Sequence, residues 1–170
     1  ENITIHSDGD CWYPSPKPAD MESAAWWENG GQAFVRALAT ALPPTTPGLS
    51  MWDVVNEPGH HSAGLPFAAK VADYLHKFSR GAVVTVGLDA SVANVVQRLE
   101  MMAPHVDVLA FHSYHDSWEA GLEMTELALS VSRKWSKPVF NSETGCIARA
   151  SAYDQTIELA ARNGIGYAVW

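Results

Sequence analysis

The sequence is poor in charged residues and has no run of lysine and arginine. Only 18% of its 170 residues are charged, and acidic residues outnumber basic ones to give a formal net charge of -8. Proteins that bind a nucleic-acid backbone or an anionic membrane surface need clustered positive charge. We therefore expect no nucleic acid and no membrane as partner, and a neutral ligand fits the composition better.

Long apolar segments and cysteines are also scarce. No stretch approaches the roughly 20 apolar residues of a membrane span. The two cysteines, Cys11 and Cys146, have no metal-ligand spacing and are too few to define a disulfide framework. Because the chain opens on Glu1 and not on methionine, we expect it to be cut from a longer polypeptide, which leaves localisation undecided at this point.

Apolar and aromatic residues, in contrast, are abundant. Hydrophobic residues make up 47% of the chain, and seven tryptophans and five tyrosines are among its residues. This composition allows one sizeable core, and we interpret residues 1–170 as a single domain. The flat rings suit either core packing, which is their commoner use, or stacking on the apolar faces of sugars.

Short β-branched apolar runs alternate with helical patterns along the chain. Six strands are expected, at residues 3–6, 52–56, 82–87, 106–112, 138–141 and 165–170. Five helices are expected, at residues 32–42, 66–79, 91–102, 118–135 and 152–163. Residues 7–25 are interpreted as a long connection that either shapes a site or forms a surface loop. The alternation predicts an α/β fold.

The spacing of these elements favours a β/α barrel. Residues 57 and 143 lie 86 positions apart and enclose three strand-helix steps. Each step is therefore roughly 29 residues long, and a (β/α)8 barrel of about 250 residues uses about 31 per step. An open doubly wound sheet shares the alternation, but the Gly-rich turn that marks its first strand is missing. We predict a TIM barrel.

Two of the expected strands end on a glutamate, namely Glu57 and Glu143. Barrel enzymes place their catalytic groups at the carboxyl ends of strands. Cleavage of a glycosidic bond requires one carboxylic acid to protonate the leaving oxygen and one carboxylate to attack or to activate water. A single glutamate in this position is as often an exposed loop charge, but two of them, three units apart, favour a glycosidase.

Histidines and a tyrosine complete the candidate site. By the two-residue period of a strand, His112 and Tyr114 lie on one face at the end of the expected strand 106–112. The other loop histidines, His60, His61 and His115, are interpreted as ordinary loop residues. Because no zinc-type pattern such as His-Glu-x-x-His occurs, we expect neither a metal nor an organic cofactor.

Four strand ends together resemble those of clan A glycoside hydrolases, and most of all family 5, the cellulase family. They are Asn56-Glu57-Pro58, His112-x-Tyr114, Glu143-Thr144-Gly145 and Trp170, which look like strands four, six, seven and eight. The resemblance implies that Glu57 is the acid/base and Glu143 the nucleophile of a retaining enzyme. It also implies that Asn56 bonds the sugar 2-hydroxyl, and that His112, Tyr114 and Trp170 surround the subsite.

The same resemblance makes residues 3–9 the third barrel strand and its end, with Asp8 and Trp12 as further candidate sugar contacts. The chain would then be a partial barrel of about six βα units, strands three to eight, without the first two units and the last helix. Because an incomplete barrel exposes sheet edges, we expect that the chain is a fragment or that a second chain completes the barrel.

The expected function is hydrolysis of β-1,4-linked oligo- or polysaccharides, with glucan, mannan or xylan undecided, by the two-carboxylate double-displacement mechanism. Family habit suggests a secreted or periplasmic enzyme. Two alternatives stay open: an exo-acting clan A enzyme of the β-galactosidase, β-glucuronidase or β-mannosidase type, and a carbohydrate-binding protein without catalysis.

Overall fold

The computed structural model describes residues 16–115, 117–145 and 150–169, and only the backbone of residues 150–152. The chain divides into two compact units, one up to Val86 and the other from Gly87 onward. The expected strand 3–6 and the candidate residues Asp8, Trp12 and Trp170 lie outside the described residues. Within the described part of the chain, the helices are all too short or too polar to cross a membrane.

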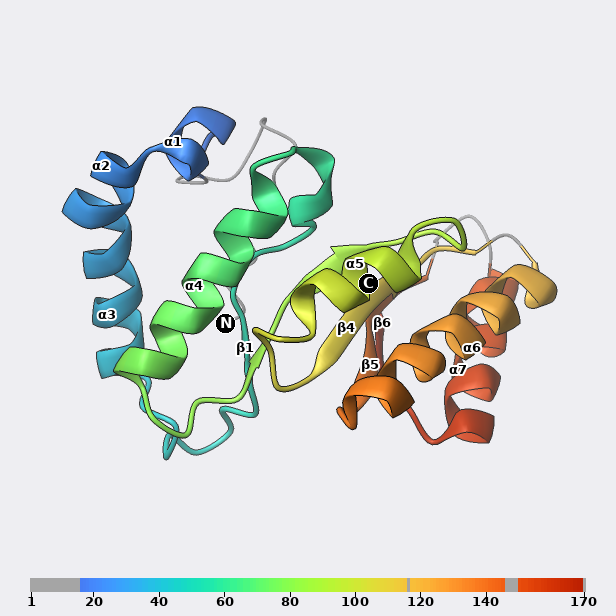
Figure 1. Cartoon of the computed structure of the whole chain (residues 1–170). Coiled ribbons are helices and arrows are strands. Elements are labelled where there is room, and N and C mark those ends of the chain that lie inside the picture. Colours follow the sequence, from blue (N-terminus) through green and yellow to red (C-terminus); the bar gives the residue numbers. More distant parts are fainter. Residues whose placement is uncertain (1–15, 116, 146–149, 170) are drawn as a thin grey trace. The chain divides into compact units, whose positions relative to one another are not determined.

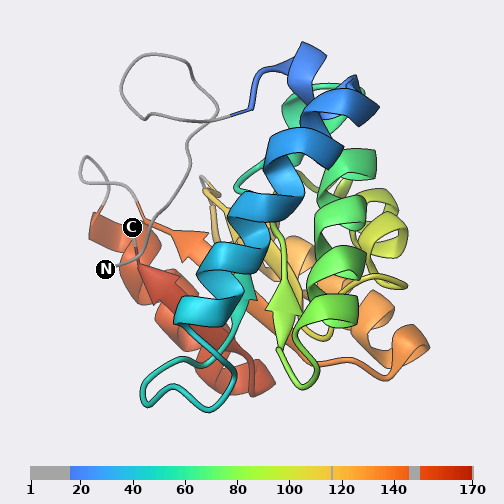
Figure 2. The same ribbon diagram turned by 90° about the vertical axis from the view of Figure 1, so that its left-hand side faces the viewer.

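The first unit is mainly helical and holds a short parallel sheet. Its elements are α1 (Pro18–Glu22), α2 (Ala24–Trp26), the π-helical turn η1 (Trp27–Gly31), α3 (Gln32–Ala41), β1 (Trp52–Asp53), the 3-10 turn η2 (Pro58–His60), α4 (Gly64–Phe78) and β2 (Val84–Thr85). Strands β1 and β2 pair in parallel. Helix α3 lies alongside α4, and α4 packs on β2 (Figures 1 and 2).

Helices α1 and α2 lie where the sequence analysis expects a long connection, so that expectation is wrong from Pro18 onward. Pro18 occupies the first helical position, and the backbone N–H of Lys17 donates to the Asp20 carboxylate at 2.9 Å. Ser23 then caps α2 by accepting from the N–H of Trp26 at 3.1 Å. These local caps stabilise two short helices in a segment whose proline content suggested a loop.

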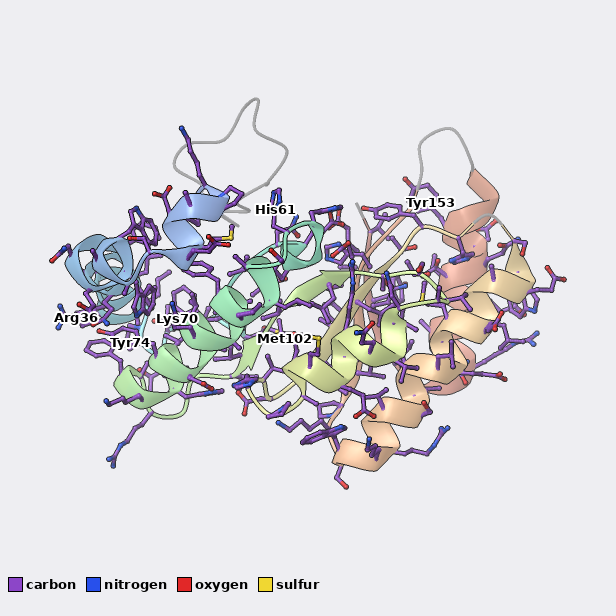
Figure 3. All side chains as sticks on the ribbon, turned by 45° about the horizontal axis from the view of Figure 1, so that its top comes forward. Arg36, His61, Lys70, Tyr74, Met102 and Tyr153 are labelled. Carbon is purple, nitrogen blue, oxygen red and sulfur yellow. The ribbon has the colours of Figure 1, made fainter. Side chains whose placement is uncertain are left out.

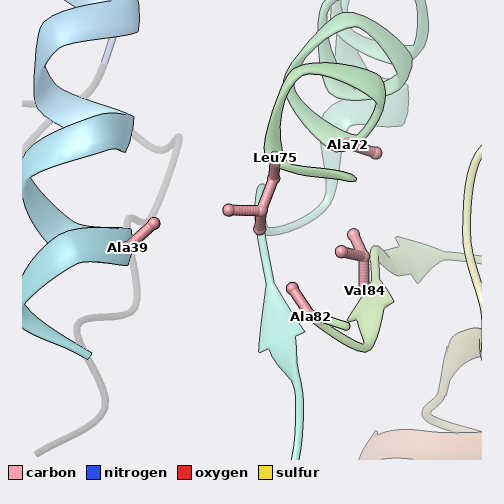
Figure 4. Close-up of a cluster of buried hydrophobic side chains, with 5 residues drawn as sticks. All are labelled: Ala39, Ala72, Leu75, Ala82 and Val84. Carbon is pink, nitrogen blue, oxygen red and sulfur yellow. The ribbon is translucent and has the colours of Figure 1, made fainter. Parts of the chain in front are cut away.

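Small and aliphatic side chains form one core of the first unit, and Figure 4 shows five of them: Ala39, Ala72, Leu75, Ala82 and Val84. A second cluster surrounds Trp27. Its ring meets Phe67 edge-on, with 5.9 Å between the centroids, and also meets Tyr74, which is labelled on α4 in Figure 3, at 5.3 Å. Edge-to-face contacts of this kind stabilise an aromatic core. Trp27 therefore has a packing role.

The second unit is a four-stranded parallel sheet whose strands are joined by helices. Its elements are β3 (Gly87–Asp89), α5 (Val95–Met102), β4 (Leu109–Ser113), α6 (Trp118–Trp135), β5 (Val139–Thr144), α7 (Ala150–Asn163) and β6 (Gly166–Val169). The sheet order is β3-β4-β5-β6. Helices α5, α6 and α7 each pack on strands of this sheet (Figure 1). This is the predicted strand-helix alternation.

The helix expected at residues 118–135 is confirmed with the same bounds. Ser117 caps its start by accepting from the N–H of Ala120 at 3.2 Å, and Ser136 ends it in a left-handed conformation. The strand expected at residues 82–87, in contrast, divides between β2 and β3, which belong to different sheets. Strand β3 also extends to Asp89, two residues beyond the predicted end.

Candidate active site

Glu143 lies near the carboxyl end of β5, and two side chains from the neighbouring chain segment hold its carboxylate. His112 of β4 places Nδ1 3.0 Å from Glu143 Oε2. Tyr114, two residues farther on, donates its hydroxyl to Oε1 in a short hydrogen bond. The side chains of His112 and Glu143 are 3% and 13% exposed, so water has little access to the pair. The structure thus brings three predicted residues together, while their catalytic role stays a prediction.

The hydrogen bonds fix the orientation of this carboxylate. A carboxylate only accepts hydrogen bonds, so the Nδ1 atom of His112 that faces it carries the proton. Hydrogen bonds to an ionised group are about twice as strong as neutral ones. Glu143 is therefore a carboxylate held in one orientation at a strand end, which suits attack on an electrophilic carbon or stabilisation of a developing positive charge.

A β-bulge in β5 decides to which side Glu143 points. Phe111 pairs with Asn141, but the next residue of β4, His112, pairs with Glu143, so Ser142 is an extra residue in β5. A bulge of this kind changes the alternation of side chains beyond it. Because partners in neighbouring parallel strands point to the same face, Glu143 shares the face of His112.

The turn after Glu143 depends on Thr144 and Gly145. The Thr144 hydroxyl donates to the carbonyl of Ser113 at 2.8 Å and lies 3.0 Å from the hydroxyl of Thr156 on α7. Gly145 has a positive φ of 119°, and a Cβ there would come within 2.3 Å of the ring of Tyr153, labelled in Figure 3. Only glycine fits this conformation and this close approach.

The register also places Asp89, which the sequence analysis did not select, next to His112. Asp89 ends β3 and is the backbone partner of His112. Its carboxylate forms an ion pair with Arg98 of α5, in which the two side chains are 19% and 18% exposed. A signal existed in the sequence, because Asp89 closely follows the apolar run that we ended at Gly87. Three polar residues, Asp89, His112 and Glu143, thus lie side by side across three strands.

Glu57 lies in the first unit, on the turn after β1. The strand expected at residues 52–56 is shorter than predicted, because β1 ends at Asp53. Glu57 itself has a left-handed backbone, with φ 46° and ψ 51°, which is uncommon for any residue other than glycine. His60 places Nε2 3.3 Å from the Glu57 carboxylate, and its own side chain is 53% exposed on this turn.

Helix α4 packs closely against this turn. Gly64, its first residue, lies so near Pro58 that a Cβ would come 1.8 Å from the Pro58 carbonyl oxygen. Pro58 is buried, and Asn56, the predicted partner of the sugar 2-hydroxyl, is half-buried on the other side of Glu57. Close packing on Pro58 therefore fixes the backbone immediately after Glu57, which helps to hold its unusual conformation.

His115 remains outside the Glu143 cluster. Its ring packs against Gly121 of α6, and its Nδ1 lies 3.1 Å from the Ser113 hydroxyl. Burial lowers the pKa of His115 below its ordinary value of 6.5, because the charged form loses hydration. Its Nε2 atom has no hydrogen-bond partner among the described residues. We assign this histidine a packing role.

No protein-family model and no curated protein sequence matches the chain. Among solved structures, it is similar to the beta-D-glucuronidase of Dictyoglomus thermophilum, with a TM-score of 0.68 and 14% identity over 86% of this chain and 29% of that one. It is also similar to a GH10 xylanase from Thermobacillus composti, with a TM-score of 0.63 and 13% identity over 94% and 60%. A third similar structure is that of a Bacteroides thetaiotaomicron protein assigned as an alpha-L-fucosidase. Its TM-score is 0.64, with 9% identity over 87% of this chain and 57% of that one.

These similarities show the fold. The chain is α/β with parallel sheets and has the fold of part of a TIM barrel, as predicted. It spans less than two thirds of the length of each of these proteins. All three are glycosidases by name, but one name specifies a β-D and another an α-L sugar. The shared fold therefore does not single out family 5.

Proposed function

We propose that the chain provides the catalytic residues of a retaining glycoside hydrolase, with Glu143 as nucleophile and Glu57 as acid/base. The observation that carries this proposal is the Glu143 carboxylate, which is largely buried near a strand's carboxyl end and held on both oxygens by Tyr114 and His112. The shared fold adds support, because TIM-barrel enzymes place their chemistry at this end of the strands.

In the first step, a Glu143 oxygen attacks the anomeric carbon while Glu57 donates its proton to the departing glycosidic oxygen. The new C–O bond forms as the glycosidic bond breaks, which leaves a glycosyl ester on Glu143 and releases an alcohol. Tyr114 and His112 serve this step by aiming the carboxylate. A positioning error of about 1 Å in such a group can lower the rate about 100-fold.

In the second step, Glu57 is a carboxylate and takes a proton from water as the water oxygen attacks the anomeric carbon. The bond to Glu143 breaks, and the sugar leaves with its original configuration. Glu57 must therefore reach both a leaving oxygen and a water molecule. Its side chain is 25% exposed, about twice the value of Glu143, which suits an exchange of protons with water.

As substrate we propose a β-1,4-linked oligo- or polysaccharide, with Asn56 binding the sugar 2-hydroxyl. The resemblance of Asn56-Glu57-Pro58 to the cellulase family and the fold shared with a xylanase support this class. In this proposal residues 1–170 act as one catalytic domain, which a second chain or further strands complete. Asp8, Trp12 and Trp170 stay predicted sugar contacts.

An exo-acting enzyme is the second candidate, and the similarity to a beta-D-glucuronidase favours it. Preference for chain length separates the two candidates. An endo-acting enzyme cleaves polymers faster than aryl monosaccharides, because it binds several sugar units along an open cleft. An exo-acting enzyme has a closed pocket and shows the opposite order. Binding of oligosaccharides without any turnover would favour the third candidate, a carbohydrate-binding protein.

Covalent trapping tests the proposed nucleophile directly. The protein is incubated with 2-deoxy-2-fluoro aryl β-glycosides of gluco, manno and xylo configuration, and the adduct is located by intact mass and peptide mapping. We expect an adduct on Glu143 that Glu143→Gln abolishes. Glu158→Gln is the matched control, since Glu158 pairs with Arg162 on the exposed side of α7. An adduct on another residue, or none on a folded protein, would contradict the proposal.

A further inference from the structure

Asn141 lies at the start of the bulge in β5, and its side chain is 4% exposed. The amide orientation that satisfies its surroundings directs the nitrogen toward two backbone carbonyls. In that orientation it donates to the carbonyl of Glu143 at 3.0 Å and to the carbonyl of Phe111 at 3.1 Å. One carbonyl belongs to the bulged strand and the other to its neighbour β4. The amide therefore bridges the two strands at the point where their register shifts.

The bulge determines the face on which Glu143 lies. With a continuous register, Phe111–Asn141 pairing would be followed by His112–Ser142 and Ser113–Glu143 pairing. Glu143 would then share the face of Ser113, opposite to that of His112, because successive residues of a strand alternate. With the bulge, Glu143 is the partner of His112. The contact between the His112 imidazole and the Glu143 carboxylate thus depends on the extra residue.

A bulge interrupts the ladder of backbone hydrogen bonds and leaves polar groups that require other partners. An asparagine amide offers two N–H donors, which matches the two carbonyls. The Ser142 hydroxyl lies 3.5 Å from the Phe111 carbonyl, too far to replace a good hydrogen bond. The Thr144 hydroxyl also links β5 to β4, at the Ser113 carbonyl beyond the bulge. The Asn141 amide differs because it bonds carbonyls on both sides of the register shift, Phe111 before it and Glu143 after it.

We propose that Asn141 is a positioning residue, which holds the bulge in β5 and thereby directs the Glu143 carboxylate toward His112 and Tyr114. The catalytic consequence rests on the proposed role of Glu143 as nucleophile, whereas the structural consequence does not. The two consequences are therefore measured separately, on the same variants.

The structural measurement uses Asn141→Leu, which has nearly the same shape but lacks the donors. The tautomer of His112 is read by long-range 1H–15N correlation spectra of the full chain, with His112→Gln to assign the signal. In the wild type we expect protonated Nδ1, facing Glu143. In Asn141→Leu we expect this state to be lost, as in Glu143→Ala. Retention of protonated Nδ1 in a folded Asn141→Leu protein would overturn the proposal.

A matched control is Asn163→Leu, because the Asn163 amide also donates to a backbone carbonyl, that of Leu159, at 2.8 Å. It removes a similar hydrogen bond at the end of α7 and leaves β5 untouched, so we expect protonated Nδ1 on His112. If Asn141→Leu does not fold, Asn141→Thr provides a second variant, whose hydroxyl can donate to one of the two carbonyls. We then expect a mixture of the two tautomers, and a spectrum identical to that of the wild type would overturn the proposal.

The kinetic measurement follows the rate of adduct formation with the activated 2-deoxy-2-fluoro glycoside. A displaced nucleophile lowers the rate of the chemical step about 100-fold. In Asn141→Leu we therefore expect the maximal rate of adduct formation to fall, while the glycoside concentration that gives half of this rate changes little. If Asn141→Leu loses the Nδ1-protonated tautomer of His112 but forms the adduct at the wild-type rate, Asn141 is not a positioning residue for the nucleophile. If the wild type forms no adduct, the proposed function fails while the tautomer still decides whether Asn141 holds the register.

Discussion

The two glutamates that we propose as catalytic residues are held in different ways. Glu143 belongs to a strand, and its two carboxylate oxygens contact the Tyr114 hydroxyl and the His112 imidazole. Glu57 lies four residues beyond the end of β1, on a left-handed turn, and contacts His60, whose side chain is 53% exposed. The first is held by two side chains of a neighbouring segment, and the second combines a left-handed backbone with a more exposed side chain.

The proposed mechanism explains why the two settings differ. A nucleophile attacks one carbon from one direction, so fixing the orientation of its carboxylate does not slow the attack. An acid/base serves two positions in turn, the leaving oxygen and the attacking water. A left-handed turn that carries a more exposed side chain suits that task. The comparison therefore predicts that changes near Glu57 affect proton transfer, whereas changes near Glu143 affect formation of the glycosyl ester.

Among the tests of this difference between the two glutamates, Glu57→Ala is expected to have the largest effect. Loss of a general acid lowers rates about 10²- to 10⁴-fold. We expect that loss on substrates with poor leaving groups, such as alkyl glycosides, and a far smaller loss on activated aryl glycosides, because an activated leaving group departs without a proton. The values of kcat/KM for the two substrate types, in wild type and variant, measure this difference in rate loss. An equal loss on both would remove Glu57 from the role of acid.

A smaller effect is expected from Gly64→Ala. Alanine would usually stabilise a helix by about 1 kcal/mol relative to glycine. Here the added Cβ would meet the Pro58 carbonyl at 1.8 Å, so α4 or the turn after Glu57 must move. Overpacking of this kind costs about 1 to 3 kcal/mol. We therefore expect a lower free energy of unfolding in urea, and slower turnover mainly of poor leaving groups.

Gly30→Ala is the matched control for that substitution, since a Cβ at Gly30 has no atom within 4 Å among the described residues. Because Gly30 lies in the helical turn η1, alanine should raise the free energy of unfolding by up to about 1 kcal/mol. The preference for leaving groups should stay close to that of the wild type. If Gly64→Ala behaved in the same way, close packing of α4 on Pro58 could not be what fixes the Glu57 turn.

The sequence predicted regular elements well and their irregular junctions poorly. Residues 118–135 were predictable because a capping serine and an apolar stripe are local signals. The bulge at Ser142 was not, because register depends on two strands about 30 residues apart. The left-handed backbone of Glu57 was not predictable either, since the packing of Gly64 on Pro58 that helps to hold it is a tertiary contact. Asp89 was missed because we took Gly87, two residues before it, as the end of the strand.

The smallest expected effect concerns His115, which follows Tyr114 and packs against Gly121 of α6. Burial lowers the pKa of His115 below the ordinary value of 6.5, so at intermediate pH the unfolded chain binds the proton more readily than the folded one. The stabilising contribution is thus present above about pH 6.5 and is lost as the pH falls through the lowered pKa of the folded state. We expect His115→Gln to reduce this loss of unfolding free energy, measured in urea between pH 7.5 and pH 5. Replacement of the exposed His61 by glutamine should not reduce it. An unchanged pH dependence in His115→Gln would mean that His115 stays hydrated in the folded state, so that the segment after Tyr114 is more open to water than its packing on Gly121 indicates.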